Sequence, residues 1–199
     1  MEKGREKLGI LGGMGPQATQ VFYQWVLDLT DASCDQEHVP AVIISDTAMP
    51  DRTEAILSGN TQAVFSKLLE DARLLEDCGC GCIAIPCNTS HYFWEQLQEK
   101  AGIPIINMPA EAVRVCASRG CRKAAILATE GTVRTGVYHR QCQAFGIEPW
   151  APPEGIQRLV TSIIYDEIKA GEKGSRSKFA KIDAALRAAG CDGAILACT

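Results

Sequence analysis

The chain has 199 residues, of which 46% are hydrophobic and 22% charged, and its formal net charge is −4 at pH 7. These values exclude a mainly disordered protein, and the lack of excess Lys and Arg argues against a nucleic-acid partner. No apolar run reaches the roughly 18 residues of a membrane span, and the charged residues 1–7 do not resemble a signal sequence, so we expect no membrane partner and a cytoplasmic protein whose cysteines are reduced.

Short apolar runs alternate along the chain with longer stretches of helical period, which is typical of an α/β protein with mainly parallel strands. In chain order, these runs predict strands at residues 8–11, 41–45, 82–85, 103–106, 124–128 and 193–197. Parallel strands of this kind carry helices on both faces, so we expect each strand to be buried on both sides.

Three positions predict where helices begin or end between these strands. Pro16 is expected at the first position of a helix that carries an amphipathic run over residues 21–29. Asn60 is expected to be the N-cap of a later helix, because apolar residues follow it at helical spacing. Gly171 is expected just past the end of a helix over residues 159–168.

An internal repeat divides the chain into two related halves. The matching segments are KLGILGGMGP (7–16) with KAAILATEGT (123–132), and CGCIAIPCNT (80–89) with CDGAILACT (191–199). We therefore expect two α/β domains, one over residues 1–105 that carries Cys87 and one over residues 106–199 that carries Cys198. The repeat makes these two cysteines an equivalent pair.

Cys87 and Cys198 each follow an apolar strand, at the edge where parallel α/β sheets bind their ligands. Cys87 leads into a predicted helix, whose positive N-terminal end favours a thiolate. A small residue in a tight turn would explain either cysteine alone, but recurrence at the equivalent place favours chemistry. Two opposed thiols suit racemisation, in which one face of a carbon loses a proton and the other face gains one. Strand-end N–H groups would hold the charge that develops beside a carboxylate.

Five segments bring the chain close to a known family. They are ILGGMGPQAT (10–19), PDRTEAIL (50–57), AIPCNTSH (84–91), ATEGTVRT (128–135) and LACT (196–199). In this order they resemble the aspartate/glutamate racemase family, in its aspartate racemase branch. The resemblance implies two pseudo-symmetric three-layer αβα domains with mainly parallel sheets and an active site in an inter-domain cleft. It also implies a PLP-independent racemase that needs no cofactor or metal, acts on a small acidic amino acid and forms a homodimer.

The resemblance also assigns roles to individual residues. Cys87 and Cys198 would be the two bases that remove and return the α-proton from opposite sides of the substrate. Arg52 looks like the family's clamp on a substrate carboxylate, a task that suits the bidentate geometry of a guanidinium, and Lys169 matches a lysine that reaches the substrate from the second half. The other expected substrate-binding residues are Met14, Asn88, Thr89, Thr129, Thr132 and Thr199. The plainer interpretations are a surface arginine, a lysine at a helix end and helix-capping Asn and Thr.

A nucleotide site is the main alternative. Gly13, Gly15 and Ala18 form a G-x-G-x-x-A pattern after the first strand, and Asp46 ends the second strand, as in a dinucleotide-binding turn. The pattern is short, contains Pro16 and does not account for a paired cysteine.

Two further clusters have plain interpretations. Cys78, Cys80 and Cys82 are spaced by two, whereas zinc ligands usually come as C-x₂₋₄-C pairs, so we expect these cysteines to pack in the interior. His91 follows Cys87 by one helical turn and is expected either to orient the site or, more simply, to be a capping or surface histidine.

The substrate and the end of the chain are the last two expectations. Aspartate and glutamate differ by one methylene, which a pocket distinguishes by only ~1–3 kcal/mol. Arg52 and the GGMGP and PDRT segments favour aspartate, while glutamate, broad specificity, and a binding protein without turnover stay as alternatives. Family members continue past the second Cys-Thr with an acidic residue and a helix that packs back on the first domain. We expect that tail to be missing here, and a chain truly ending at Thr199 to be a badly impaired enzyme.

Overall fold

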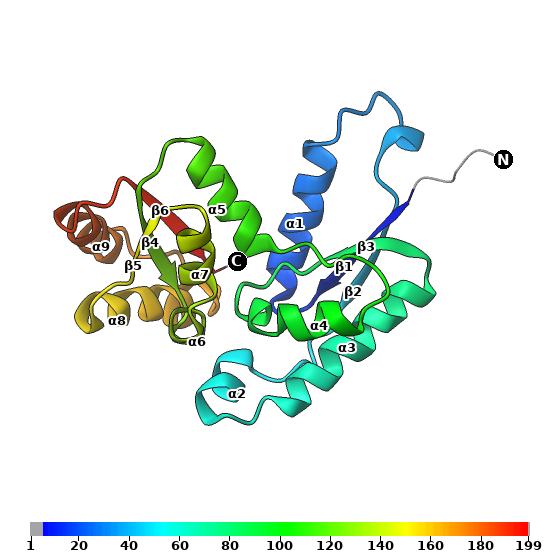
Figure 1. Ribbon diagram of the computed structural model, residues 1–199, viewed down its shortest axis with the longest axis horizontal. Helices are drawn as coiled ribbons and strands as arrows, with labels where there is room; N and C mark the ends of the chain where they lie inside the picture. Colours follow the sequence, from blue (N-terminus) through cyan, green and yellow to red (C-terminus); the bar gives the residue numbers. More distant parts are fainter. Residues whose placement is uncertain (1–5, 199) are drawn as a thin grey trace. The chain divides into compact units, whose positions relative to one another are not determined.

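The computed structural model describes residues 6–198, which form two compact units (Figure 1). The first unit ends at Met108, and the second runs from Pro109 to Cys198. Each unit has a parallel sheet of three strands. Within residues 6–198 no helix is both long and apolar enough to cross a bilayer.

The first unit is built on a sheet with strand order β2-β1-β3. Its strands are β1 (Lys7–Gly12), β2 (Ala41–Ser45) and β3 (Cys80–Ala84). The helices are α1 (Pro16–Asp28), the 3₁₀ helix η1 (Asp35–Glu37), α2 (Arg52–Ser58), α3 (Gln62–Asp77), the 3₁₀ helix η2 (Thr89–Phe93) and α4 (Trp94–Lys100).

Helices cover both faces of this first sheet. A Cβ at Gly9 would lie 3.1 Å from the Leu75 side chain of α3, whereas a Cβ at Gly12 would collide with Thr19 of α1. Positions 9 and 12 of a strand point to opposite faces, so α3 and α1 lie on opposite sides of the sheet, which makes three layers.

The second unit repeats this plan with strand order β5-β4-β6. Its strands are β4 (Lys123–Ala128), β5 (Glu148–Trp150) and β6 (Gly193–Ala197). Its helices are α5 (Met108–Ser118, which begins at the last residue of the first unit), α6 (Glu130–Thr135), α7 (Val137–Ala144), α8 (Glu154–Ser162), the π-helix η3 (Ile163–Ile168) and α9 (Arg176–Ala188).

The central strand β4 is buried from its second residue onward, between two apolar clusters. Ile126 packs in a cluster with side chains of α5 and α7, while its neighbours Ala125 and Leu127 pack in another with side chains of α8 and α9. Alternate residues of a strand face opposite sides, so this unit is also a three-layer αβα sandwich. The expected fold class is confirmed, and so is the relation between the halves: in both sheets the first strand is central, with the second and third on either side.

Three sequence predictions need correction. Residues 103–106 do not form a strand, because Pro104 lacks an N–H and only Ile105 makes a bridge, to Ile83. The strand β5 was missed, since Glu-Pro-Trp is too short to show a period. The N-cap of α3 is Thr61 rather than Asn60.

The first helix begins at Pro16 as predicted, but its apolar run is not a core face. Of α1 only Thr19 is buried, while Val21, Trp25 and the following Leu29 are 47%, 59% and 85% exposed. These residues are four apart and form one apolar stripe on the surface of this helix.

Candidate active site

The turn after β1 is held close to the end of β2. Gly13 has a φ of +92°, and a Cβ there would collide with the backbone of Asp46, so only glycine fits. The next residue, Met14, is 5% exposed. Its Sδ accepts a hydrogen bond of 3.2 Å from the Ser90 hydroxyl, and its carbonyl accepts one of 3.2 Å from Arg52 Nη2. The turn after β1 is therefore in contact with the segments that follow β2 and β3.

Arg52 is fixed by backbone carbonyls. It is the first residue of α2, whose N-cap Asp51 accepts the N–H of Glu54 at 2.8 Å. Its Nη1 donates to the carbonyls of Pro50 at 2.9 Å and Met49 at 3.4 Å.

One edge of the Arg52 guanidinium has unpaired N–H donors. Its Nε is buried without a hydrogen-bond partner, and Nη2 uses one of its two protons on Met14. Nε and Nη2 form the edge that binds a carboxylate in a bidentate manner. Arg52 is therefore not a freely solvated surface arginine, and its open donors fit an acidic group.

Cys87 lies in the buried segment that follows β3. Its side chain is 5% exposed, its N–H donates to the Ile85 carbonyl at 2.8 Å, and its neighbours Asn88 and Thr89 are 5% and 8% exposed. The helix expected directly after it is only the five-residue 3₁₀ helix η2, followed by α4. The dipole of a single 3₁₀ turn is weak, so it contributes little to holding a thiolate at Cys87.

His91 is buried, so the surface alternative considered for this residue is wrong. Its side chain is 4% exposed, and both ring nitrogens contact backbone groups. Burial lowers the pKa of His91, although carbonyl contacts at Cys87 and Ile106 oppose the shift. The spacing of four from Cys87 was the available signal, but it does not by itself distinguish a buried ring from an exposed one.

Thr129 and Thr132 lie at the carboxyl end of β4, and both are buried. Thr129 is the N-cap of α6: its hydroxyl oxygen accepts the N–H of Thr132 at 3.3 Å and lies 3.1 Å from the Thr132 hydroxyl. The capping interpretation therefore holds for Thr129.

Cys198 follows β6 directly and is half-buried. The register pairs Ala128 with Ala197, so Thr129 and Cys198 continue two paired strands at the same edge of the sheet. Thr199 lies outside the described residues. The structure thus places Cys87 after β3 and Cys198 after β6, the corresponding strands of the two sheets.

Lys169 follows the π-helix η3 and is exposed. Its Nζ lies 4.6 Å from the centroid of the Tyr165 ring, a cation–π distance. Gly171, close after it, has a φ of +85° and ends the helical segment as predicted. A π-turn is rare and often lies at a functional site, which fits a role for Lys169.

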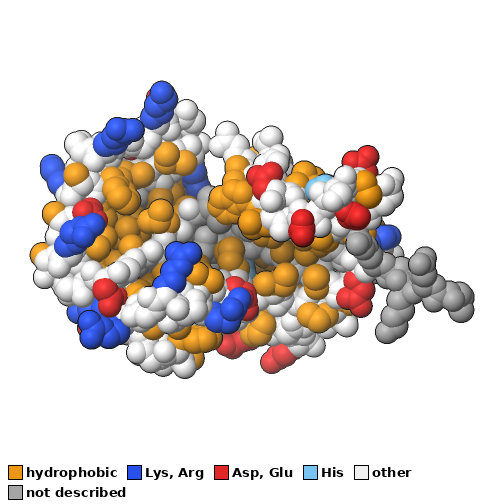
Figure 2. Space-filling view, turned by 90° about the horizontal axis from the view of Figure 1, so that it is seen from above, with side chains coloured by type: hydrophobic (Ala, Val, Ile, Leu, Met, Phe, Trp, Pro, Cys, Tyr) orange, Lys and Arg blue, Asp and Glu red, His pale blue; other side chains and the backbone are white. Residues whose placement is uncertain are grey.

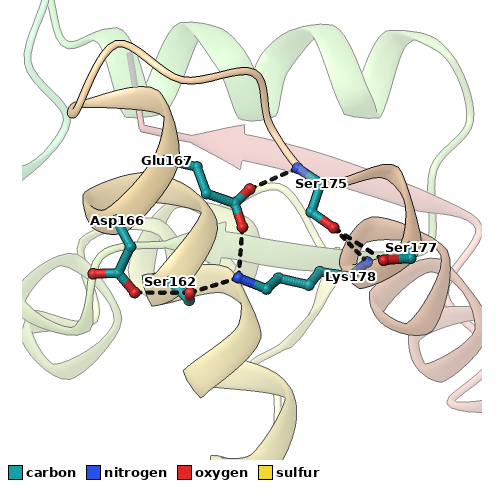
Figure 3. A network of polar contacts seen from close by, with 6 residues as sticks. All are labelled: Ser162, Asp166, Glu167, Ser175, Ser177 and Lys178. Atoms are coloured by element: carbon teal, nitrogen blue, oxygen red, sulfur yellow. Dashed lines mark hydrogen bonds and ion pairs between the residues drawn. The ribbon is translucent and has the colours of Figure 1, made fainter.

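A polar network ties η3 to the start of α9 (Figure 3). Glu167 accepts from Lys178 Nζ at 2.5 Å and from the Ser175 N–H at 2.6 Å. Lys178 also donates to the Ser162 hydroxyl at 2.8 Å, which in turn donates to Asp166 at 2.8 Å. Together with the contact between the Ser175 and Ser177 hydroxyls, these bonds join the two ends of the loop that carries Lys169.

The alternative sites are occupied by structural contacts. Asp46, the expected ribose ligand, makes an ion pair of 3.1 Å with Lys67 of α3. Burial raises the pKa of both Cys80 and Cys82, which keeps them as thiols. Cys78 is exposed, so the three do not share one interior site. Within residues 6–198 no group of three or more His, Cys, Asp or Glu side chains is arranged to hold a metal.

The family model described as Asp/Glu/Hydantoin racemase matches residues 11–199. The chain belongs to this family. The broad specificity amino-acid racemase RacX of Bacillus subtilis is 29% identical to it over 145 residues, which are 71% of this chain and 62% of that protein. The chain therefore spans less than two thirds of the length of this curated relative.

Solved racemase structures share the fold of this family member. The aspartate racemase of Picrophilus torridus is 28% identical, with a TM-score of 0.80 over 97% of this chain and 80% of that one. An aspartate racemase homologue from Pyrococcus horikoshii is 22% identical, with a TM-score of 0.78 over 97% of this chain and 85% of that one. The second likeness concerns the fold alone. The resemblance drawn from the sequence motifs is confirmed at the level of the family.

Proposed function

We propose that this member of the Asp/Glu/Hydantoin racemase family interconverts L- and D-aspartate without a cofactor, with Cys87 and Cys198 as its two bases. The observation that carries the proposal is their equivalence: each thiol follows the third strand of its own sheet. One thiolate removes the α-proton from the substrate, and the other thiol donates its proton to the opposite face of the same carbon. After one turnover the two cysteines have exchanged protonation states, which is the form that acts on the opposite enantiomer.

The negative charge that develops beside the substrate carboxylate needs fixed donors. Asn88 and Thr89 directly follow Cys87, while Thr129 continues the strand that pairs with the strand before Cys198. We assign this task to these three residues and to Thr132, all four of which are buried. We place Met14 with them, because it holds Arg52 and Ser90. Thr199, directly after Cys198, is assigned to substrate binding by family resemblance.

An acidic substrate is supported by the unpaired donors of Arg52 and by the positive charge of Lys169. Most of the basic residues of the chain belong to the second unit and most of the acidic ones to the first, as one face shows in Figure 2. The basic second unit attracts a dicarboxylate by its field. We prefer aspartate to glutamate because the 28% identical solved relative is an aspartate racemase. Because the relative RacX is a broad specificity amino-acid racemase, broad specificity is the second candidate function.

The decisive experiment follows α-proton exchange. The protein is incubated in D₂O with L-aspartate, L-glutamate or L-alanine, and deuterium uptake is read by NMR and chirality by chromatography. We expect deuterium and inversion with aspartate, and a loss of racemisation of about 10²-fold or more in Cys87→Ser and in Cys198→Ser. Cys34→Ser, at an exposed cysteine, is the matched control.

Other outcomes of this experiment are equally clear. Inversion of alanine at a comparable rate would replace aspartate racemase by a broad-specificity enzyme. Racemisation that persists in both cysteine variants would exclude the two-thiol mechanism. No exchange with any of the three substrates would favour a binding protein without turnover.

We further propose that the enzyme is a cytoplasmic homodimer. All ten cysteines are free thiols, which suits a reducing compartment. The exposed apolar stripe of α1, which consists of Val21, Trp25 and Leu29, offers a surface for a second copy.

A further inference from the structure

His91 holds the main chain of Cys87. Its Nδ1 lies 2.9 Å from the Cys87 carbonyl oxygen, and its own N–H donates to the Asn88 carbonyl at 3.1 Å. The N–H of Cys87 donates to the nearby Ile85 carbonyl. The imidazole thus adds a side-chain contact to the peptide groups of Cys87.

The contacts of Nε2, on the opposite side of the ring, bear on which nitrogen of His91 carries the proton. The N–H of Met108 donates to Nε2 at 3.2 Å. Nε2 also lies 3.4 Å from the Ile106 carbonyl, whereas the contact of Nδ1 with the Cys87 carbonyl is much shorter, at 2.9 Å. We therefore assign the ring proton to Nδ1, which donates it to the Cys87 carbonyl, and the lone pair to Nε2, which accepts from Met108. Burial favours the same neutral form, because it lowers the pKa of His91. A neutral ring with both nitrogens engaged is neither a general acid nor a metal ligand.

The ring thereby connects two segments that are far apart in sequence. Met108 is the first residue of α5 and the last of the first unit, and it follows the stretch in which Trp94 Nε1 donates to the Ile105 carbonyl at 2.8 Å. His91 therefore links the Cys87 backbone to this anchored stretch, in addition to the short helix η2.

We infer that His91 is a positioning residue for Cys87: its Nδ1–H holds the Cys87 carbonyl, and thereby directs the thiol, while Met108 fixes the ring. This inference rests on the proposed role of Cys87 as a base. A displacement of about 1 Å at a reacting group costs up to about 10²-fold in rate. His91 acts through Cys87 and does not touch the substrate.

The test separates the two bonds of the ring. Asn at position 91 places an N–H near that of Nδ1 and keeps the bond to the Cys87 carbonyl, whereas Gln places its carbonyl near Nε2 and keeps the bond from Met108. We expect His91→Asn to retain kcat within about 3-fold and His91→Gln to lose about 10- to 100-fold in kcat with little change in KM. His139→Asn, at a partly buried histidine of α7, is the control.

A second readout needs no turnover. Alkylation of each cysteine by iodoacetamide is followed by peptide mass spectrometry, and thermal unfolding is recorded for all variants. We expect Cys87 to react at least about 3-fold faster in His91→Gln than in His91→Asn, because a released turn exposes its buried thiol, with Cys198 unchanged. Equal activity and equal alkylation in the two variants, or losses that follow only the unfolding temperature, would overturn the inference. An inactive wild type with the expected alkylation pattern would instead overturn the racemase proposal alone.

Discussion

Asp71 is a buried carboxylate in the first unit. It lies on α3 with 5% exposure, one turn after Lys67, whose Nζ is 3.9 Å from Asp71 and 3.1 Å from Asp46. Burial, assisted by the charge of Asp46, raises the pKa of Asp71 to about 6. The folded protein therefore binds this proton more tightly than the unfolded chain does, and the native state loses stability as the pH rises from about 4 through about 6.

Replacing Asp71 by Asn should stabilise the protein at neutral pH. At pH 7.5 we expect a gain in the free energy of unfolding of about 1 kcal/mol, once screening by solvent is allowed for, because the buried charge is removed. At pH 4.5 the wild-type carboxyl is already protonated in the native state, so the gain should shrink towards zero. Urea unfolding at the two pH values measures both. Glu70→Gln, which removes an exposed partner of the same lysine, should show no such dependence, and a gain that is equal at both pH values would contradict this account.

At the scale of elements, the network of Figure 3 ties the π-helix η3 to the start of α9. The Lys178 and Ser175 contacts hold the pKa of Glu167 below its ordinary value, so this carboxylate stays charged between the two helices. Lys178→Met removes the bonds to both Glu167 and Ser162. The loop that carries Lys169 then loses its fixed end.

We expect Lys178→Met to raise KM for aspartate by about 3- to 10-fold while kcat changes by less than about 2-fold, since the proposed task of Lys169 is binding. Steady-state kinetics and urea unfolding would be compared with Arg187→Met. That control removes an exposed ion pair, with Asp183, from the same helix. If the two variants have the same KM as wild type, the network does not position Lys169.

The elements also show how far a sequence predicts structure. Strands β1, β2, β4 and β6 were predicted because each is a short apolar run. The expected burial on both faces is wrong for the edge strands β2 and β6, where Ile43 and Leu196 are exposed. The edge strand β5 contains Pro149 and exists through its pairing with β4, which leaves no local pattern. Residues 103–106 show the reverse case, in which an apolar run contributes only one bridge.

The candidate site likewise has features that the sequence predicts and features that it does not. The pairing of Cys87 with Cys198 could be found by the repeat, because it depends on strand order alone. The hydrogen bonds from Arg52 to three carbonyls and the two ring contacts of His91 could not be predicted, because tertiary packing brings their partners together.

For the whole molecule, the apolar stripe of α1 predicts self-association. Trp25→Glu places a charge at its centre, so we expect the wild type to be a dimer and this variant a monomer in light scattering at micromolar concentration. Leu74→Glu is the control, because Leu74 is a similarly exposed apolar residue on α3, at 52% against 59% for Trp25. A monomeric wild type, or a dimer that survives in Trp25→Glu, would contradict the prediction.

The matching strand orders of the two sheets bear on the origin of the chain. A half-length ancestor would have carried one strand-end cysteine, so any chemistry that needs two such groups would have required two identical copies. Duplication and fusion remove that constraint, because the copies can then change separately. Arg52 lies between the second and third strands of the first unit and Lys169 between the second and third strands of the second, so the same connection carries a different basic residue in each half. In a fused chain, different residues of the two halves can bind the two different ends of a substrate.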